Sequence, residues 1–272
     1  MEIFRDKVAI VTGAASGIGR ALSAELARRG AVVVMADVNA GMLEEAVGSI
    51  TAAGGRAHAA LLDVTDAAGV KKLVDDTAAS HGRLDYLFNN AGIGVMGDAH
   101  EFSIEDWRRV IDVNLYGVVH GVAAAYPLMV RQGFGHIVNT ASMAGLVPAT
   151  GEISYVASKY GIVGLSNALR LEAAPLSVRV SVVCPGIIDT PIFYTTKLIN
   201  ADREKVLGLR KWMMSPEQCA RVILRGVEKN RATIVVTAMA KAFWWLQRFS
   251  PWLMGLVWAF FMKKLREART ED

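Results

Sequence analysis

The chain has 272 residues, 53% of them apolar, and a formal net charge of +4. This length suits one α/β domain with a sizeable core, while the small and scattered charge argues against nucleic-acid binding. Two cysteines make no disulfide framework, and no Cys/His spacing indicates a metal site. The N-terminus has no apolar run of signal-peptide length, so we expect an intracellular, cytoplasmic protein.

Short apolar runs alternate with segments of helical periodicity along most of the chain. Buried strands are expected at 7–13, 31–37, 56–64, 84–92, 135–142, 178–186 and 232–236, and helices at 16–30, 41–53, 66–81, 104–132, 152–174 and 215–229. This alternation predicts a parallel sheet covered by helices on both faces, doubly wound through right-handed crossovers. We predict one Rossmann-like α/β domain with a seven-stranded parallel sheet over residues 1–237, and a helical extension over residues 238–272.

The turn after the first strand reads TGAASGIG and carries Gly13, Gly17 and Gly19. Glycine permits positive φ and lets the backbone approach a pyrophosphate closely, while the following helix points its free N–H groups at the anion. A dinucleotide cradle is favoured. A plain glycine-rich turn remains the alternative, because the spacing differs from the usual G-x-G-x-x-G.

Asp37 ends the second strand, where an acidic residue accepts hydrogen bonds from the adenosine ribose hydroxyls of a dinucleotide. The same carboxylate repels a 2′-phosphate, and the neighbouring Ser16, Val38 and Asn39 carry no positive charge to hold one. The predicted cofactor is therefore NAD, with NADP disfavoured. A simple cap is the alternative role of Asp37.

Further motifs follow in order: NNAG at 89–92, Ser142, YVASK at 155–159 and Pro185-Gly186. Together with the glycine-rich turn, they resemble the short-chain dehydrogenase/reductase family over about residues 5–237. Tyr155 and Lys159 share one helix face, and a neighbouring ammonium lowers the pKa of a phenol, so Tyr155 is expected to act as the general acid–base. Ser142, at the carboxyl edge of the sheet, is expected to hold the substrate oxygen beside it.

The resemblance implies roles for further residues. Lys159 would also bind the nicotinamide ribose, and Asn114 would distort its helix and order a water that leads protons to Lys159. An Asn filling a helix–helix contact is the alternative for Asn114. The implied cofactor contacts are Gly13, Ser16, Gly17, Ile18, Gly19, Asp37, Asp63, Val64, Asn90, Ala91, Gly92, Tyr155, Lys159, Pro185, Gly186, Ile188 and Thr190.

The stretch after Thr190 has the length and mixed polarity of a mobile substrate lid. Apolar side chains in this stretch and in other parts of the chain predict that the substrate is a hydrophobic secondary alcohol or ketone. Steroid-like, retinoid-like and long-chain molecules fit this prediction equally well. The expected pocket residues are Met96, Ser142, Met143, Leu146, Val147, Tyr155, Phe193, Tyr194, Trp212 and Met213.

The tail is rich in aromatic residues between Trp245 and Phe261, and basic residues follow at Lys263, Lys264, Arg266 and Arg269. Its longest apolar run is too short to span a bilayer. Three alternatives stay open: helices packed on the body or a partner, a helix lying on a membrane, and a cap over an apolar pocket. The resemblance implies a homo-oligomer, and the tail favours a dimer through the helices at 104–132 and 152–174 over a tetramer.

These observations predict an NAD-dependent oxidoreductase that interconverts a hydrophobic secondary alcohol and its ketone. Two alternatives remain. The first is an NADPH-dependent 3-oxoacyl-type reductase, against which Asp37 argues. The second is a non-catalytic dinucleotide-binding interaction protein, against which the complete set of Asn114, Ser142, Tyr155 and Lys159 argues.

Overall fold

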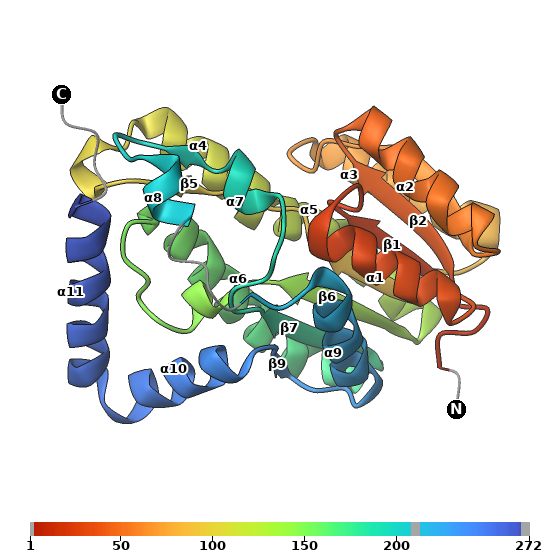
Figure 1. Ribbon diagram of the computed structural model, residues 1–272. Helices are drawn as coiled ribbons and strands as arrows, with labels where there is room; N and C mark the ends of the chain where they lie inside the picture. Colours follow the sequence, from red (N-terminus) through yellow and green to blue (C-terminus); the bar gives the residue numbers. More distant parts are fainter. Residues whose placement is uncertain (1–2, 208–212, 268–272) are drawn as a thin grey trace.

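One sheet of seven parallel strands runs through the molecule (Figure 1). The computed structural model describes residues 3–207 and 213–267. In spatial order β3-β2-β1-β4-β6-β7-β9, the strands are β3 (Arg56–Leu61), β2 (Val32–Asp37), β1 (Val8–Thr12), β4 (Tyr86–Asn89), β6 (Gly135–Thr140), β7 (Val178–Cys184) and β9 (Thr233–Val235). The predicted doubly wound α/β fold is confirmed.

Helices cover both faces of this sheet. One layer contains α1 (Gly17–Arg28), α2 (Ala40–Ala52) and α9 (Pro216–Glu228), and the other contains α3 (Ala67–His81), α5 (Gly117–Gln132) and α6 (Ile153–Ala173). Alternate residues of one strand face the two layers: Val11 lies in the core with Leu22 of α1, and Ile10 lies in the core with Met129 of α5. Because both of its faces are buried, the central strand β1 is apolar along nearly its whole length, whereas the edge strand β3 is mostly exposed.

The order of the strands reverses at β1. This strand pairs with β2 on one side and with β4 on the other, both in parallel. In open α/β sheets, ligands bind outside the carboxyl ends of the strands at such a point. The turn after β1 and the segment after β4 therefore border the expected site.

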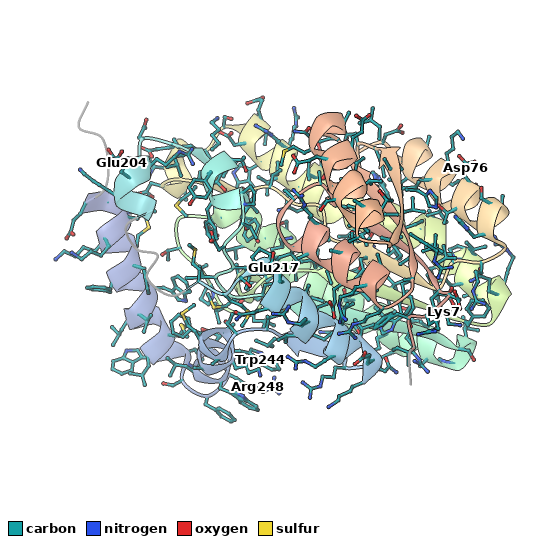
Figure 2. All side chains as sticks on the ribbon, turned by 45° about the vertical axis from the view of Figure 1, so that its right-hand side comes forward. Lys7, Asp76, Glu204, Glu217, Trp244 and Arg248 are labelled. Carbon is teal, nitrogen blue, oxygen red and sulfur yellow. The ribbon has the colours of Figure 1, made fainter. Side chains whose placement is uncertain are left out.

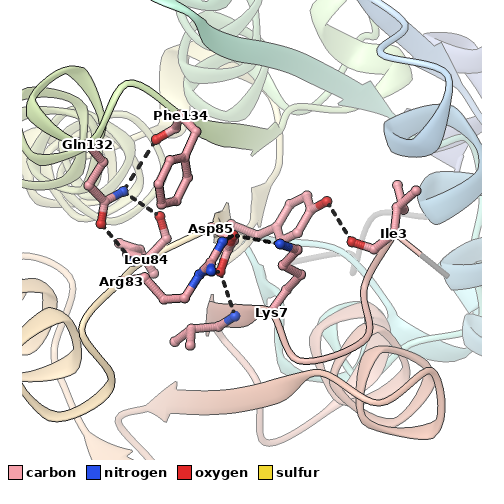
Figure 3. A network of polar contacts seen from close by, with 9 residues as sticks. Ile3, Lys7, Arg83, Leu84, Asp85, Gln132 and Phe134 are labelled. Carbon is pink, nitrogen blue, oxygen red and sulfur yellow. Dashed lines mark hydrogen bonds and ion pairs between the residues drawn. The ribbon is translucent and has the colours of Figure 1, made fainter.

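The opposite, amino-terminal edge of the sheet is held by a polar network around Asp85 (Figure 3). Its Oδ2 accepts hydrogen bonds from the backbone N–H of Val8 at 2.9 Å and from Nε of Arg83 at 2.7 Å. The side-chain amide of Gln132, at the end of α5, bonds both backbone groups of Leu84 at 2.9 Å. These contacts join the starts of β1 and β4 to a helix end, away from the carboxyl edge.

The helix predicted over 104–132 is continuous but contains one π-helical turn. α4 (Ile104–Ile111) leads into this turn at Asp112–Tyr116, and α5 follows directly. Within the described part of the chain, only this helix is long and apolar enough to cross a membrane. It is packed on the sheet in this fold, with Val110 and Val118 buried.

Short elements surround the carboxyl edge. β5 (Val95–Met96) and β8 (Lys197–Leu198) form a separate parallel pair. The others are η1 (Ala99–Glu101), η3 (Met143–Gly145), η4 (Ala174–Leu176), α7 (Ile192–Thr195) and α8 (Arg203–Leu207). The stretch predicted as a lid thus contains α7, β8 and α8. It is tied to the body through β5 and through a 2.7 Å ion pair between Lys197 and Asp106.

The tail is helical, as predicted. It forms α10 (Ala238–Phe249) and α11 (Pro251–Glu267), which lie along two edges of the molecule (Figure 1). Thr237 caps α10 by accepting a hydrogen bond from the backbone N–H of Ala240 at 3.1 Å. Ser250 has a non-helical backbone before Pro251, so α10 ends here and α11 starts at Pro251.

One face of the tail packs on the body. Ala240 and Met254 are fully buried, in one core layer with Val147 of the loop after β6 and Ile162 of α6. Of the three alternatives for the tail, this face therefore shows the first, in which the helices pack on the body of the protein. The division of the chain at residue 237 remains a prediction.

Candidate active site

The glycine-rich turn after β1 has the shape of an anion cradle. Gly13 and Gly17 have φ values of 65° and 52°, in the region that favours glycine. A Cβ on Gly19 would collide with the carbonyl oxygen of Gly13, so no side chain fits there. Helix α1 starts in this turn, with Ser16 as its extended N-cap residue and Ile18 in its first turn. Free N–H groups and open backbone at a helix start fit a dinucleotide pyrophosphate.

Two side chains fix this turn to the segment after β4. Oγ1 of Thr12 accepts hydrogen bonds from the backbone N–H groups of Asn90 and Ala91, at 3.0 and 3.1 Å. The side-chain amide of Asn90 donates to the carbonyl of Thr12 at 3.0 Å. The sequence analysis missed Thr12. Its position at the end of the first apolar run was the only available signal.

Asp37 lies at the end of β2, as predicted, and supports the turn itself. One carboxylate oxygen accepts from the backbone N–H of Ala15 and the other from that of Asn39, both at 3.0 Å. Each oxygen keeps a second lone pair, so the carboxylate can also bind ribose hydroxyls. In the segment after the neighbouring strand β3, Asp63 is exposed and Val64 is buried.

The segment after β7 approaches the cradle from the other side. A Cβ on Gly17 would lie 3.1 Å from Cγ2 of Thr190, which is itself buried. The carbonyl of Pro185 accepts a 2.7 Å hydrogen bond from the backbone N–H of Met143. A side chain on Gly186 would collide with Thr237, and Ile188 is buried. The fold thus brings the predicted cofactor residues of three loops together.

Asn114 sits in the π turn and is fully buried. Its Oδ1 accepts from the backbone N–H of Ile93 at 2.9 Å, and its Nδ2 donates to the Ile93 carbonyl at 3.0 Å. Nδ2 also lies 3.2 Å from Oγ of Ser158 on α6. A Cβ on Gly92 would lie 3.3 Å from Oδ1 of Asn114 and 3.5 Å from Nζ of Lys159. The distorted helix therefore holds Asn114 beside α6, the helix that carries Tyr155 and Lys159.

Lys159 and Tyr155 lie on one face of α6, as the sequence predicts. Lys159 is buried, and its ammonium donates a 3.0 Å hydrogen bond to the carbonyl of Thr140 at the end of β6. Its Nζ is 5.2 Å from the centre of the Tyr155 ring. Burial lowers the pKa of Lys159 to about 8.

The pKa of Tyr155 departs from the sequence-based expectation. Burial raises this pKa well above its ordinary value, and the carboxylate of Glu152 raises it further, while a side-chain hydrogen bond with Ser142 lowers it. We expected the neighbouring ammonium to lower it, but burial in the structure outweighs that effect. Ser142 is held by its own turn, since its Oγ accepts from the backbone N–H of Ala144 at 3.1 Å.

Glu152 is a further titratable group that the sequence analysis missed. It is the N-cap residue of α6, one helical turn before Tyr155, and burial raises its pKa to about 7. No motif marks it, because a lone Glu before a helix is a common helix start. The carboxyl of Glu152 therefore changes charge near neutral pH, as the ammonium of Lys159 does with its pKa of about 8.

The expected substrate residues lie in different environments. Met96, Leu146, Phe193 and Met213 are half-buried, and Tyr194 is exposed. Met143 and Val147 are buried in one core layer with tail residues Phe243, Trp244 and Trp258. Val147 thus supports the wall of the site from behind. Trp212 lies outside the described residues.

The comparisons with known proteins agree with this geometry. The family model described as short chain dehydrogenase matches residues 7–199. The chain is 39% identical to a cyclohexanol dehydrogenase of Acinetobacter sp. (strain SE19), with 81% of this chain and 87% of that protein covered. It is 38% identical to a 3-oxoacyl-acyl-carrier-protein reductase of Thermotoga maritima, over 80% of this chain and 89% of that protein.

A solved structure gives the same result. A short-chain dehydrogenase/reductase of Burkholderia phymatum in complex with NAD superposes with a TM-score of 0.84 at 32% identity, covering 92% of this chain and 95% of that one. The family model covers more than half of the chain, and the solved structure has the same overall fold. The chain therefore belongs to the short-chain dehydrogenase/reductase family of nicotinamide-dinucleotide-dependent oxidoreductases.

Proposed function

We propose that this protein interconverts a hydrophobic secondary alcohol and its ketone with NAD as the cofactor. One observation carries the proposal. Half-buried Tyr155 has a side-chain hydrogen bond with Ser142 and the Lys159 ammonium 5.2 Å from its ring. A phenol beside a hydroxyl and a cation, at the carboxyl edge of a dinucleotide-binding sheet, is equipped to exchange a proton with an alcohol.

Each residue then has a defined part. When bound, the dinucleotide accepts or donates the hydride. Ser142 holds the substrate oxygen by a hydrogen bond, and Tyr155 takes the hydroxyl proton during oxidation and returns it during reduction. Lys159 keeps a positive charge below the phenol and binds the nicotinamide ribose. Asn114 positions the segment after β4 through Ile93.

The preference for NAD rests on Asp37. Its carboxylate repels a 2′-phosphate, and no basic side chain stands at Ser16, Val38 or Asn39 to bind one. The remaining cofactor contacts that we propose are Gly13, Gly17, Ile18, Gly19, Asp63, Val64, Asn90, Ala91, Gly92, Pro185, Gly186, Ile188 and Thr190.

The substrate is proposed to be hydrophobic because thioether, aliphatic and aromatic side chains surround the chemical group. Met96, Met143, Leu146 and Phe193 come from three segments at the carboxyl edge, those after β4, β6 and β7. The similarity to a cyclohexanol dehydrogenase supports an alicyclic or longer alkyl alcohol.

The similarity to a 3-oxoacyl reductase favours one second candidate, an NADPH-dependent reduction of an acyl thioester ketone. Asp37 opposes it, because that reaction needs the 2′-phosphate to be accepted. The two proposals differ in both cofactor and substrate, so one assay separates them.

We also propose a homodimer through α4, α5 and α6. Their outward surface contains the apolar side chains Ile104, Tyr116, Ile153, Tyr160 and Leu171, all of which are exposed in the single chain. Such a cluster is a frequent feature of subunit interfaces. We propose a cytoplasmic location for the body of the enzyme.

The test is a panel of alcohols and ketones, assayed with NAD(H) and NADP(H) by absorbance of the reduced cofactor. We expect turnover of alicyclic or long-chain secondary alcohols with NAD. Turnover of only 3-oxoacyl thioesters with NADPH would replace the proposal by the second candidate. Tight dinucleotide binding without turnover of any member would support a non-catalytic role.

A further inference from the structure

The two tail helices have one buried face and one exposed apolar face. On the inner side, Ala240, Met254, Val257 and Trp258 pack in the core layer described above. On the outer side, the exposed large apolar residues are Trp245, Phe249, Trp252, Leu253, Leu256, Phe260 and Phe261. Trp245, Phe249 and Trp252 are 52%, 76% and 72% exposed. Neither the fold of the family nor the chemistry of the site requires these aromatic side chains to be exposed to water.

This outer face is contiguous around the bend between α10 and α11. The rings of Trp245 and Phe249 stack with centroids 5.4 Å apart, and Trp252 follows Phe249 by three residues, across the bend. Leu256 and Phe260 continue along α11 at the spacing of one helix face. Figure 1 shows both helices at the periphery, with no other element outside them. Apolar patches of this extent on soluble proteins mark interaction surfaces.

Most of the charged side chains around this face are positive. No acidic residue occurs between Lys229 and Arg266, whereas Lys241, Arg248, Lys263 and Lys264 lie on the tail helices and are exposed. Figure 2 shows Arg248 beside Trp244 at the edge formed by α10. The ammonium of Lys264 lies 6.0 Å from the centre of the Phe260 ring and pairs with Glu267, and Arg266 pairs with Asp98.

We infer that the outer face of α10 and α11, as defined by these seven apolar residues, docks on an anionic lipid surface. Tryptophan and phenylalanine rings flanked by Lys and Arg suit the boundary between headgroups and acyl chains. A second copy of the chain fits less well. A two-fold interface would place Lys241, Arg248 and Lys263 of one tail against those of the other. The carboxylate at the end of α11, Glu267, already pairs with Lys264 of its own chain.

The inner side of the same helix reaches the rim of the active site. Trp258 accepts a 3.3 Å hydrogen bond from Thr150 through its carbonyl, and Leu265 packs on Gly151. An open groove of about 800 Å³ lies between this loop and α11. It is lined by the apolar groups of Pro148, Gly255, Trp258, Ala259 and Met262, and by the polar residues Thr150, Lys263, Arg266 and Glu267. The loop leads directly into the helix that carries Tyr155.

Docking would therefore bring an apolar groove, adjacent to the site, to the lipid surface. This step rests on the proposed function: it identifies the substrate as an alcohol or ketone dissolved in the membrane. The docking itself is independent of catalysis and is tested without a substrate.

The experiment is sedimentation of the full-length protein with vesicles of equimolar phosphatidylglycerol and phosphatidylcholine, and with vesicles of phosphatidylcholine alone. We expect binding to the anionic vesicles that weakens with salt, together with a blue shift of the tryptophan emission. The variant carrying Trp245→Gln, Phe249→Gln and Trp252→Gln should lose at least about tenfold in partition coefficient. Lys263→Gln with Lys264→Gln should weaken binding to the anionic vesicles.

The matched control is Leu61→Gln, which replaces a similarly exposed apolar side chain on β3 (70% exposed) and should bind vesicles as the wild type does. Circular dichroism melting checks that every variant is folded. Two results would overturn the docking inference. One is a full-length protein that stays in the supernatant with anionic vesicles at low salt. The other is a triple variant that becomes a smaller oligomer in sedimentation velocity while the wild type binds no vesicles, which would assign the face to a second copy.

The substrate step has its own readout. Vesicles should stimulate oxidation of a water-insoluble alcohol, and the triple variant should lose this stimulation while it retains turnover of a small soluble alcohol. Vesicle binding without any stimulation would leave the docking surface in place and overturn membrane delivery of the substrate. Absence of turnover with both alcohols would instead contradict the proposed function.

Discussion

The ammonium of Lys159 lies 5.2 Å from the centre of the Tyr155 ring and donates a hydrogen bond to the carbonyl of Thr140 at 3.0 Å. The main chain at the end of β6 thus fixes the cation in a buried place that would otherwise favour its neutral form. With a pKa of about 8, Lys159 is mostly protonated at neutral pH. It therefore supplies a positive charge beside the phenol without a carboxylate partner.

Replacing Tyr155 by Phe removes the proton-transferring oxygen and keeps the ring. We expect turnover to fall by a factor of about a hundred or more, the usual scale for loss of a general acid–base group. NAD binding, measured by fluorescence titration, should persist. Tyr160→Phe, on the same helix, is the control and should leave turnover unchanged. Near-normal turnover of the Tyr155 variant would contradict the assignment.

Asp37 should set the cofactor preference. The wild type is expected to favour NAD, and Asp37→Ser combined with Val38→Arg should shift the ratio of kcat/KM values toward NADP by at least about tenfold, because a charge-assisted hydrogen bond replaces a repulsion. Steady-state assays with both cofactors measure the ratio. Asp37→Asn controls for the loss of support to Ala15. Equal wild-type efficiency with NADP would refute the role of Asp37.

Glu152→Gln should shift the pH profile of alcohol oxidation toward lower pH. The carboxylate of Glu152 raises the pKa of Tyr155, so removing this charge lowers the pH at which the phenol can act as a base. The measurement is kcat/KM for oxidation against pH, with the exposed Glu105→Gln as the control. A loss of turnover with an unchanged pH profile would indicate a purely structural role for Glu152.

His136 should make stability depend on pH. Burial lowers its pKa from 6.5 to about 3, and its Nε2 lies 2.9 Å from Oγ of Ser181. The unfolded chain therefore binds a proton between these values that the folded protein does not bind. The contribution of neutral His136 to the free energy of unfolding is complete above about pH 6.5. This contribution is lost as the pH falls toward 3.

Melting temperature measured across this pH window should accordingly fall with decreasing pH. His136→Gln should flatten the dependence, whereas replacing the exposed His58 on β3 should not. An unchanged slope in the His136 variant would assign the acid sensitivity to other groups.

The tail should contribute to the stability of the whole domain through its inner face alone. Met254→Ala removes a fully buried side chain and should lower the free energy of unfolding by about 2–5 kcal/mol. Leu256→Ala, on the outer face of the same helix, should change it by less than about 0.5 kcal/mol. Urea denaturation compares the two. Equal losses would mean that the two faces of α11 are wrongly assigned.

Much of the fold follows from local patterns. Short, mostly apolar runs between helical segments predicted all seven strands, since buried parallel strands carry a signal along their own length. Residues whose role depends on contacts made only in the folded structure gave no such signal in the sequence. Thr12 matters because it bonds Asn90, and Glu152 because burial perturbs it beside Tyr155. Sequence spacing alone also misjudged the pKa of Tyr155, which depends on how deeply the fold buries the phenol.

The contacts of α11 with the loops after β4 and β6 have a consequence for the order of events during synthesis. Arg266 bonds Asp98, and Leu265 packs on Gly151, so these two loops beside the candidate site are held by a helix that follows the whole sheet in the chain. The last strand ends at Val235 and α11 begins at Pro251, so the sheet, the glycine-rich turn and the Tyr155 helix leave the ribosome before α11 does. The proposed cofactor residues are therefore all synthesised before the helix that holds these two loops.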